Sequence, residues 1–94
     1  MDSPWKVSVA EEADAEISEL EPEFREAILA VVESFSEAPF PPDAIHLKGT
    51  NDLYRIRLDG YRIVYRVNRR RRTVRVERVR RRSVAYRGLE PKRK

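Results

Sequence analysis

The chain has 94 residues, of which 40% are hydrophobic and 38% charged, and its net charge is +4. This length and balance are typical of one globular domain with a modest core. The sequence has no cysteine and one histidine, which excludes a disulfide framework and argues against a His/Cys metal site. It contains no apolar run near the roughly 18 residues that span a bilayer, and no secretion signal. We therefore expect a single cytoplasmic domain over residues 1–94, without membrane segment, metal or cofactor.

Charge is distributed unevenly along the chain. Residues 1–46 hold two basic residues against twelve acidic ones, a net charge of −10. Residues 47–94 hold eighteen basic residues against four acidic ones, a net charge of +14. Sixteen of the twenty basic residues are arginine, whose planar guanidinium group can bind phosphate through two parallel hydrogen bonds. The second half is expected to face a polyanionic partner. A compositional bias toward arginine is the plainer alternative for the loop arginines.

The first half is predicted to form a strand and two helices. Residues 5–9 alternate in polarity as a strand does. In the acidic stretch 10–20 the apolar residues recur at helical spacing, which predicts a short amphipathic helix. Pro22 suits the first turn of a second helix, whose apolar stripe covers residues 24–35. This helix is expected to stop before Pro39, because the residue that precedes a proline resists helical geometry.

The second half is predicted to form three strands, over residues 53–58, 61–67 and 73–79, all rich in Ile, Val and Tyr. Asp59-Gly60 is a strong signal for a two-residue hairpin turn, since both turn residues must accept a positive φ. The element order is therefore β-α-α-β-β-β. We expect an α+β fold in which an antiparallel sheet has the two N-terminal helices packed on one face.

The two-residue turn also fixes how the hairpin strands pair. Leu58 is expected opposite Tyr61, and Arg57 opposite Arg62. One face of the hairpin is then apolar enough to cover the helices, with Tyr54, Ile56, Leu58, Tyr61, Ile63 and Tyr65. The other face carries Arg55, Arg57, Arg62 and Arg66 beside Val64. Like charges placed opposite each other destabilise a sheet, so this face is predicted to bind phosphate, with the acidic helices facing away. An ordinary solvated sheet face is the alternative.

Four features of the sequence match a known family. They are the element order, LKG at residues 47–49, YRIRLDGYRIVYRV at residues 54–67 and VRRRSVAY at residues 79–86. With these features the chain resembles the RelE/ParE superfamily of toxins from type II toxin–antitoxin systems, specifically its RelE-like branch of messenger-RNA endonucleases. The closing motif of the family usually reads Val-Gly-His-Arg followed by a tyrosine, so Arg80 and Arg81 depart from the pattern.

The resemblance implies a metal-independent endoribonuclease that cleaves mRNA in the ribosomal A site by 2′-hydroxyl attack and so inhibits translation. It makes Arg55 and Arg57 contacts of the scissile phosphate, and Arg62 the stabiliser of the developing charge. Arg82 would assist the leaving group, and Tyr86 would activate the nucleophile. Because unperturbed tyrosine titrates near ~10 and arginine above ~12, both transfer protons slowly at neutral pH. Such a catalyst depends on positioning, which suits a strand held by the ribosome.

The resemblance also implies partners: the ribosome, mRNA and a cognate antitoxin. Further basic residues are expected to contact RNA, although a solvated loop is an equal alternative for the run 69–72. These residues are Lys48, Arg66, Arg69, Arg70, Arg71, Arg72, Arg80 and Arg81. Two other functions stay open. A ParE-like protein of the same fold would inhibit DNA gyrase without catalysis, and should lack the Arg/Tyr set. A non-catalytic RNA-binding module or degenerate toxin would bind RNA without cutting it.

Overall fold

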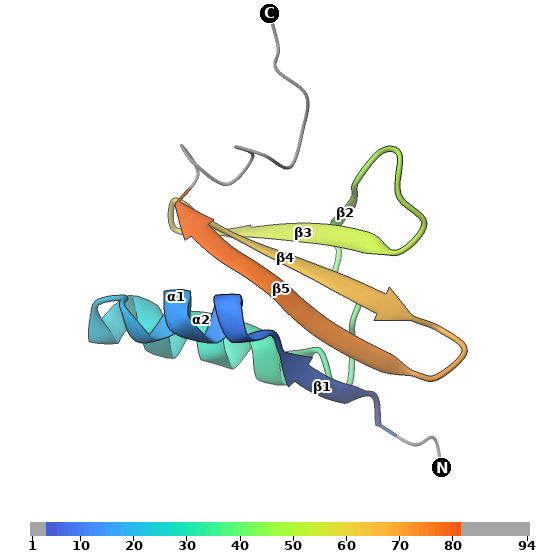
Figure 1. Ribbon diagram of the computed structural model, residues 1–94, viewed down its shortest axis with the longest axis horizontal. Helices are drawn as coiled ribbons and strands as arrows, with labels where there is room; N and C mark the ends of the chain where they lie inside the picture. The colour runs from blue at the N-terminus through green and yellow to red at the C-terminus, as the bar shows by residue number, and fades with distance from the viewer. Residues whose placement is uncertain (1–3, 82–94) are drawn as a thin grey trace, which may run out of the picture.

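The computed structural model describes residues 4–81, which form two helices and a five-stranded sheet (Figure 1). The predicted α+β class is confirmed. The strand Ile45–His46 was not predicted, because its two residues are too few to show an alternating pattern. The elements are β1 (Lys6–Val9), α1 (Glu11–Ser18), α2 (Pro22–Ser34), β2 (Ile45–His46), β3 (Leu53–Leu58), β4 (Tyr61–Asn68) and β5 (Thr73–Arg81).

The strands lie in the order β1-β5-β4-β3-β2. Neighbouring strands from β2 to β5 are antiparallel, as predicted, but β1 joins the sheet parallel to β5. The sheet is therefore mixed rather than wholly antiparallel. The two helices separate β1 from the hairpins, so no tight turn fixes its direction. It pairs with the last strand, with Lys6 opposite Thr73 and Val9 opposite Val76.

The β3–β4 hairpin has the predicted register. Leu58 lies opposite Tyr61, and Arg57 lies opposite Arg62. The two turn residues both have positive φ, 50° at Asp59 and 82° at Gly60, as a tight turn between twisted strands requires. Successive side chains of β3 and β4 therefore alternate between the two faces of the sheet in the predicted way.

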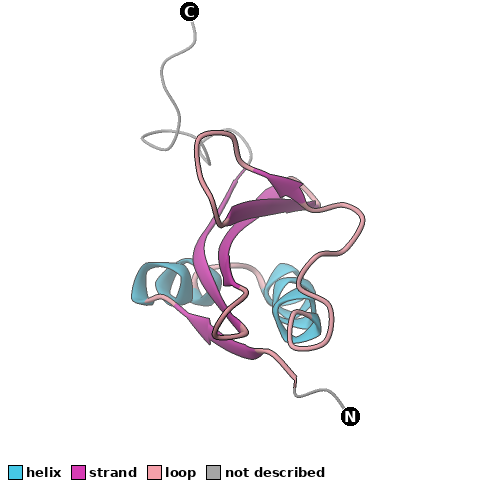
Figure 2. Cartoon of the chain, turned by 90° about the vertical axis from the view of Figure 1, so that its right-hand side faces the viewer, coloured by secondary structure: helices cyan, strands magenta, loops and turns pink. Residues whose placement is uncertain are grey.

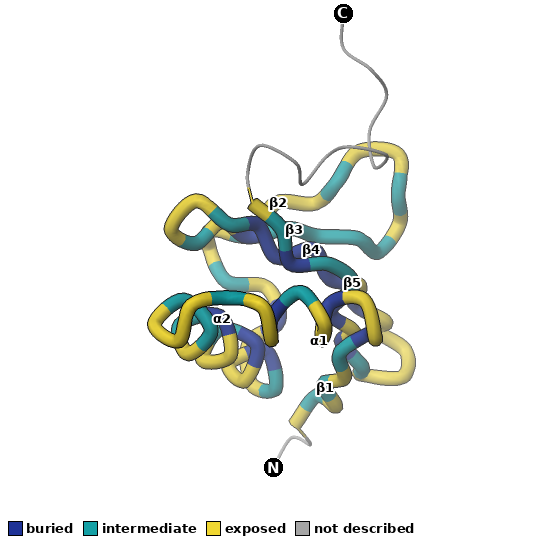
Figure 3. The backbone as a smooth tube through the Cα atoms, turned by 60° about the vertical axis from the view of Figure 1, so that its left-hand side comes forward, coloured by how far each residue is buried: buried dark blue, intermediate teal, exposed yellow. Residues whose placement is uncertain are grey.

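A single apolar core joins the strongly twisted sheet to both helices, which lie below β3, β4 and β5 in Figure 1 and on either side of the strands in Figure 2. Val32 and Phe35 at the end of α2 pack against the apolar face, where Ile63 and Tyr65 are fully buried. The rings of Phe35 and Tyr65 stack with their centroids 4.2 Å apart. The buried stretches follow the strands and the inward sides of the helices (Figure 3). Within residues 4–81, no helix is long and apolar enough to cross a membrane.

Candidate functional site

Three arginines from three neighbouring strands lie in register across the face of the sheet that turns away from the core. Arg62 of β4 is opposite Arg57 of β3 on one side and Arg80 of β5 on the other. We call Arg57, Arg62 and Arg80 the arginine row. Residues opposite one another in an antiparallel ladder point to the same face, so three cationic side chains meet here. Their exposure differs: Arg57 is exposed, Arg80 is half-buried, and Arg62 is only 4% exposed.

The next pairs along the strands bring a further predicted residue to the same face. Arg55 lies two residues from Arg57 on β3 and opposite Val64 of β4. It is half-buried, and Val64 is buried. Arg55, Arg57 and Arg62 are thus gathered on one face. The other two predicted catalytic residues, Arg82 and Tyr86, lie outside the described residues.

Glu16 of α1 enters this surface from the edge of the sheet, which corrects the expectation that the acidic helices face away. Its Oε2 accepts hydrogen bonds from Nη2 and Nε of Arg78, at 2.8 and 3.2 Å, and lies 3.5 Å from Nε of Arg80. Its Oε1 accepts the backbone N–H of Val79 at 2.7 Å. The hydrogen bond to Glu16 raises the pKa of Arg78. Glu16 therefore contacts Arg80 of the arginine row, the neighbouring Arg78 and the backbone between them.

The position of Glu16 follows from the short first strand. Pairing of β1 with β5 ends at Val9 opposite Val76, so the later residues of β5 have an open edge with N–H groups to satisfy. Helix α1 begins directly after β1 and lies along this edge. Its apolar residues Ala13 and Ile17 are buried in the core, and Glu16 adjoins this buried stripe. An acidic residue beside the buried stripe of a helix is the sequence signal that could have identified Glu16 as a contact of the sheet.

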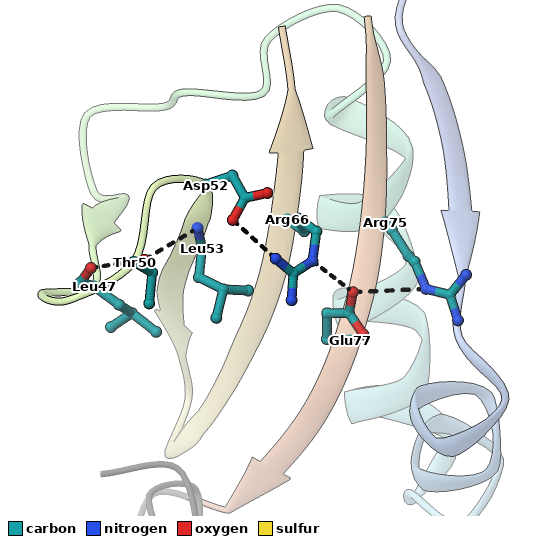
Figure 4. A network of polar contacts seen from close by, with 7 residues as sticks. All are labelled: Leu47, Thr50, Asp52, Leu53, Arg66, Arg75 and Glu77. Carbon is teal, nitrogen blue, oxygen red and sulfur yellow. Dashed lines mark hydrogen bonds and ion pairs between the residues drawn. The ribbon is translucent and has the colours of Figure 1, made fainter. Parts of the chain in front are cut away.

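Arg66, a predicted RNA contact, lies in an ion-pair network (Figure 4). Its Nη1 donates to Oδ1 of Asp52 at 2.8 Å, and its Nε donates to Oε2 of Glu77 at 3.2 Å. Nε of Arg75 lies 3.6 Å from the same oxygen of Glu77. These contacts raise the pKa of Arg66, chiefly through the hydrogen bond to Glu77. This face of the sheet is therefore partly neutralised at the end where Arg66 lies.

Sequence reasoning missed Glu77 because a β-bulge sets its position. Val64 is opposite Arg78, whereas the next residue, Tyr65, is opposite Val76. Glu77 is thus the extra residue of the bulge, and it lies beside Arg66. Simple alternation along β5 contains no signal for this irregularity.

The other predicted RNA contacts lie in turns or at the end of β5. Lys48 is exposed in the loop between β2 and β3, where Gly49 has a positive φ of 81° and Thr50 Oγ1 donates to the carbonyl of Leu47 at 2.8 Å (Figure 4). The run 69–72 forms the exposed turn between β4 and β5. Arg81 is exposed, with its guanidinium carbon 5.8 Å from the centre of the Tyr61 ring.

An open hollow of about 340 Å³ adjoins the arginine row where α1 and β5 end. Acidic, basic and apolar side chains all line it, including those of Glu19, Leu20 and Arg81. Within residues 4–81, no group of three or more metal-ligating side chains is close enough to hold a metal ion. The geometry of the face is therefore that of a cationic surface with a carboxylate at its edge.

Residues 5–86 match the model of a family described as ParE toxin of type II toxin–antitoxin system, parDE. The chain belongs to this toxin family. The predicted membership of the RelE/ParE superfamily is confirmed. The toxin matches no curated protein sequence.

Several solved structures share the fold of this toxin. A chain of the RelE–RelB complex from the archaeon Pyrococcus horikoshii is 26% identical, with 87% of this chain and 99% of that chain covered and a TM-score of 0.77. A chain of the intact E. coli RelBE toxin–antitoxin complex is 29% identical, with 82% and 95% covered and a TM-score of 0.71. A variant of E. coli RelE in the free state is 27% identical, with 87% of each chain covered and a TM-score of 0.73.

These findings make the chain a toxin of a type II toxin–antitoxin system with the RelE/ParE fold. The matching family model is that of ParE toxins, whereas the similar solved structures are of RelE toxins. Family membership therefore does not choose between gyrase inhibition and mRNA cleavage, and the choice depends on the chemistry of the site.

Proposed function

We propose that this toxin is a ribosome-dependent endoribonuclease that cleaves mRNA in the A site and so inhibits translation. The observation that carries the proposal is the arginine row. Arg57 and Arg80 flank Arg62 directly across the strands, so one phosphate group could contact more than one guanidinium group. Charge that develops on the phosphate oxygens in the transition state is stabilised by cations already held in place.

The reaction needs little covalent chemistry from the protein. The 2′-hydroxyl of the RNA attacks the adjacent phosphorus while a base takes its proton, and the bond to the 5′-oxygen breaks as that oxygen gains a proton. The products are a 2′,3′-cyclic phosphate and a 5′-hydroxyl. Because Arg62 is only 4% exposed, its guanidinium group has little freedom to reorient during the reaction. The resemblance to RelE toxins assigns activation of the 2′-hydroxyl to Tyr86 and assistance of the leaving group to Arg82, which acts largely through its charge.

A cognate antitoxin is the proposed protein partner. The similar chain from E. coli comes from an intact toxin–antitoxin complex, and that from Pyrococcus horikoshii from a RelE–RelB complex. Net charge supports the same partner, because residues 47–94 carry eighteen basic residues against four acidic ones. An acidic segment of the antitoxin would complement this half of the toxin.

The test is to incubate the purified toxin with mRNA, with and without ribosomes, and to map the transcript ends. We expect cuts only in the presence of ribosomes, each leaving a 2′,3′-cyclic phosphate. Inducible expression in cells without the antitoxin should give the same transcript ends. Co-expression of the antitoxin should suppress them. RNA binding without cleavage, on or off ribosomes, would overturn the proposal in favour of a non-catalytic module.

Gyrase inhibition is the second candidate, because the family model that matches residues 5–86 is that of ParE toxins. The contact of Glu16 with Arg80 points the same way, because it neutralises part of the arginine row. A supercoiling assay with purified gyrase separates the two candidates. Loss of supercoiling activity, together with intact mRNA on ribosomes, would establish the ParE-like function.

A further inference from the structure

A second cationic surface lies at the other end of β4 from the arginine row. The rings of Trp5 and Phe40 meet edge to face with centroids 6.0 Å apart, and Phe40 contacts Tyr54 at 5.2 Å. The guanidinium carbon of Arg69 lies 4.3 Å from the centre of the Phe40 ring, and that of Arg72 lies 4.6 Å from the centre of the Trp5 ring. We call these five residues the arginine–aromatic surface.

The backbone holds this surface in place. In the β4–β5 turn, the side-chain oxygen of Asn68 accepts the backbone N–H of Arg71 at 2.9 Å, and Arg72 has a positive φ of 54°. The backbone N–H of Trp5 donates to the carbonyl of Ser36 at 2.8 Å. The rings and guanidinium groups come from four segments, and these hydrogen bonds hold the turn and the segment of Trp5, so the surface is preorganised rather than a loose loop.

Anchoring of the turn explains only part of this arrangement. Exposed cation–π contacts are weakly stabilising, and these two would help to fix the turn. Fixing the turn does not explain why Phe40 is 36% exposed, or why Arg70 and Arg71 are exposed between the two stacked arginines. Four consecutive cations beside an exposed ring suit a ligand that carries flat apolar groups and negative charges in alternation.

Single-stranded nucleic acid has this alternation. Its unpaired bases stack on aromatic rings and on guanidinium planes, and its phosphates attract arginine. Arg69 directly follows the end of β4 and is seven residues from Arg62, which is about 23 Å at 3.3 Å per residue. A strand on this surface would therefore be held several nucleotides from any phosphate at the arginine row.

We infer that the arginine–aromatic surface binds single-stranded nucleic acid by stacking its bases, with Arg70 and Arg71 contacting the phosphates. This goes beyond the proposed cleavage, because stacking here needs neither ribosome nor reaction. Unpaired RNA and unpaired DNA share this chemistry, and the experiment distinguishes them.

The test measures binding of labelled oligouridylate and oligodeoxythymidylate, each about 12 nucleotides long, to the whole toxin without ribosomes. Trp5 is the only tryptophan of the chain, so its fluorescence reports on this surface alone. We expect one or both oligonucleotides to bind and to quench Trp5. Preference for one of them shows whether the surface favours RNA or DNA. Inorganic polyphosphate, which has charge but no bases, should bind without this quenching.

Matched variants separate stacking from charge. Phe40→Leu keeps an apolar side chain without the aromatic face, and Arg69→Lys keeps the charge without the planar group. Each should weaken oligonucleotide binding at least about fivefold with an unchanged salt dependence. Arg71→Gln should instead reduce the slope of log affinity against log salt by about 0.7. Circular dichroism checks that each variant is folded.

Two results would overturn the inference. One is parental oligonucleotide affinity in folded Phe40→Leu, and the other is equal quenching of Trp5 by polyphosphate; either would reduce the surface to plain electrostatics. Because the assay contains no ribosome and measures no cleavage, its outcome is separate from that of the transcript-end test.

Discussion

Arg57 and Arg62 face each other on adjacent strands, yet substitution of each would report on different properties. Arg62 is 4% exposed, so its replacement would disturb packing together with any function. Arg57 is exposed, and its guanidinium group can be removed with little effect on the fold. Arg57 is therefore the better probe of the proposed reaction.

We expect Arg57→Gln to slow ribosome-dependent mRNA cleavage by about 10²-fold or more, because it removes one cation that stabilises the transition state. Arg75→Gln is the matched control: Arg75 lies on the same face of the sheet, opposite Arg66, and contacts Glu77. Single-turnover cleavage rates on ribosomes measure the effect, with melting temperatures alongside. Similar rates for the two variants would remove the arginine row from the mechanism.

Tyr65 gives a prediction about pH. Its hydroxyl donates to the carbonyl of Pro39 at 2.8 Å, and burial, aided by the nearby Tyr54, raises the pKa of Tyr65. The unfolded chain loses this proton near pH ~10, whereas the folded chain keeps it to a higher pH. The contribution to stability is therefore complete below about pH 10 and declines above it.

Tyr65→Phe should destabilise the toxin by about 1–3 kcal/mol at neutral pH, because the buried Pro39 carbonyl loses its donor. At about pH 11 the difference from the parent should shrink, since the variant has no phenol to titrate. Urea unfolding at both pH values measures this. An equal difference in the free energy of unfolding at both pH values would show that Tyr65 titrates alike in the folded and unfolded chain.

At the scale of elements, local signals determined what the sequence could predict. The β3–β4 register was predictable because Asp59-Gly60 permits only a tight turn and the flanking residues alternate. The parallel β1 and the bulge at Glu77 were not, since each depends on contacts between distant segments. The contact of Glu16 with Arg78 was missed for the same reason, because the two residues are 62 positions apart in the sequence.

Glu16 connects α1 to the edge of β5, and two substitutions should separate its roles. Glu16→Gln keeps an acceptor for the backbone N–H of Val79, whereas Glu16→Ala leaves that N–H without it. We expect Glu16→Ala to lower the free energy of unfolding by about 1–3 kcal/mol and Glu16→Gln by less. Urea unfolding compares them with Glu19→Ala, an exposed acid just after the same helix. Equal losses in both Glu16 variants would assign the whole effect to the ion pair with Arg78.

At the scale of the whole molecule, the fold separates the two charges of the sequence only in part. The acidic half forms the helices and the basic half forms β3, β4 and β5. Glu16, Asp52 and Glu77 nevertheless pair with arginines of the sheet. The sequence predicted the superfamily and the cationic face, because charge and hairpin pattern are local. It did not predict this internal neutralisation, which needs the folded arrangement.

The remaining excess of basic residues should govern how fast the antitoxin associates. Opposite charges steer two proteins together, and salt screens this attraction over a Debye length of about 10 Å at 0.1 M. We expect the association rate with the cognate antitoxin to fall at least about tenfold from low to high salt. Arg57→Gln should lower the rate at low salt, whereas Glu26→Gln, on an exposed position of α2, should not. Stopped-flow mixing measures both, and a rate independent of salt would mean that apolar contacts, rather than the cationic face, direct the encounter.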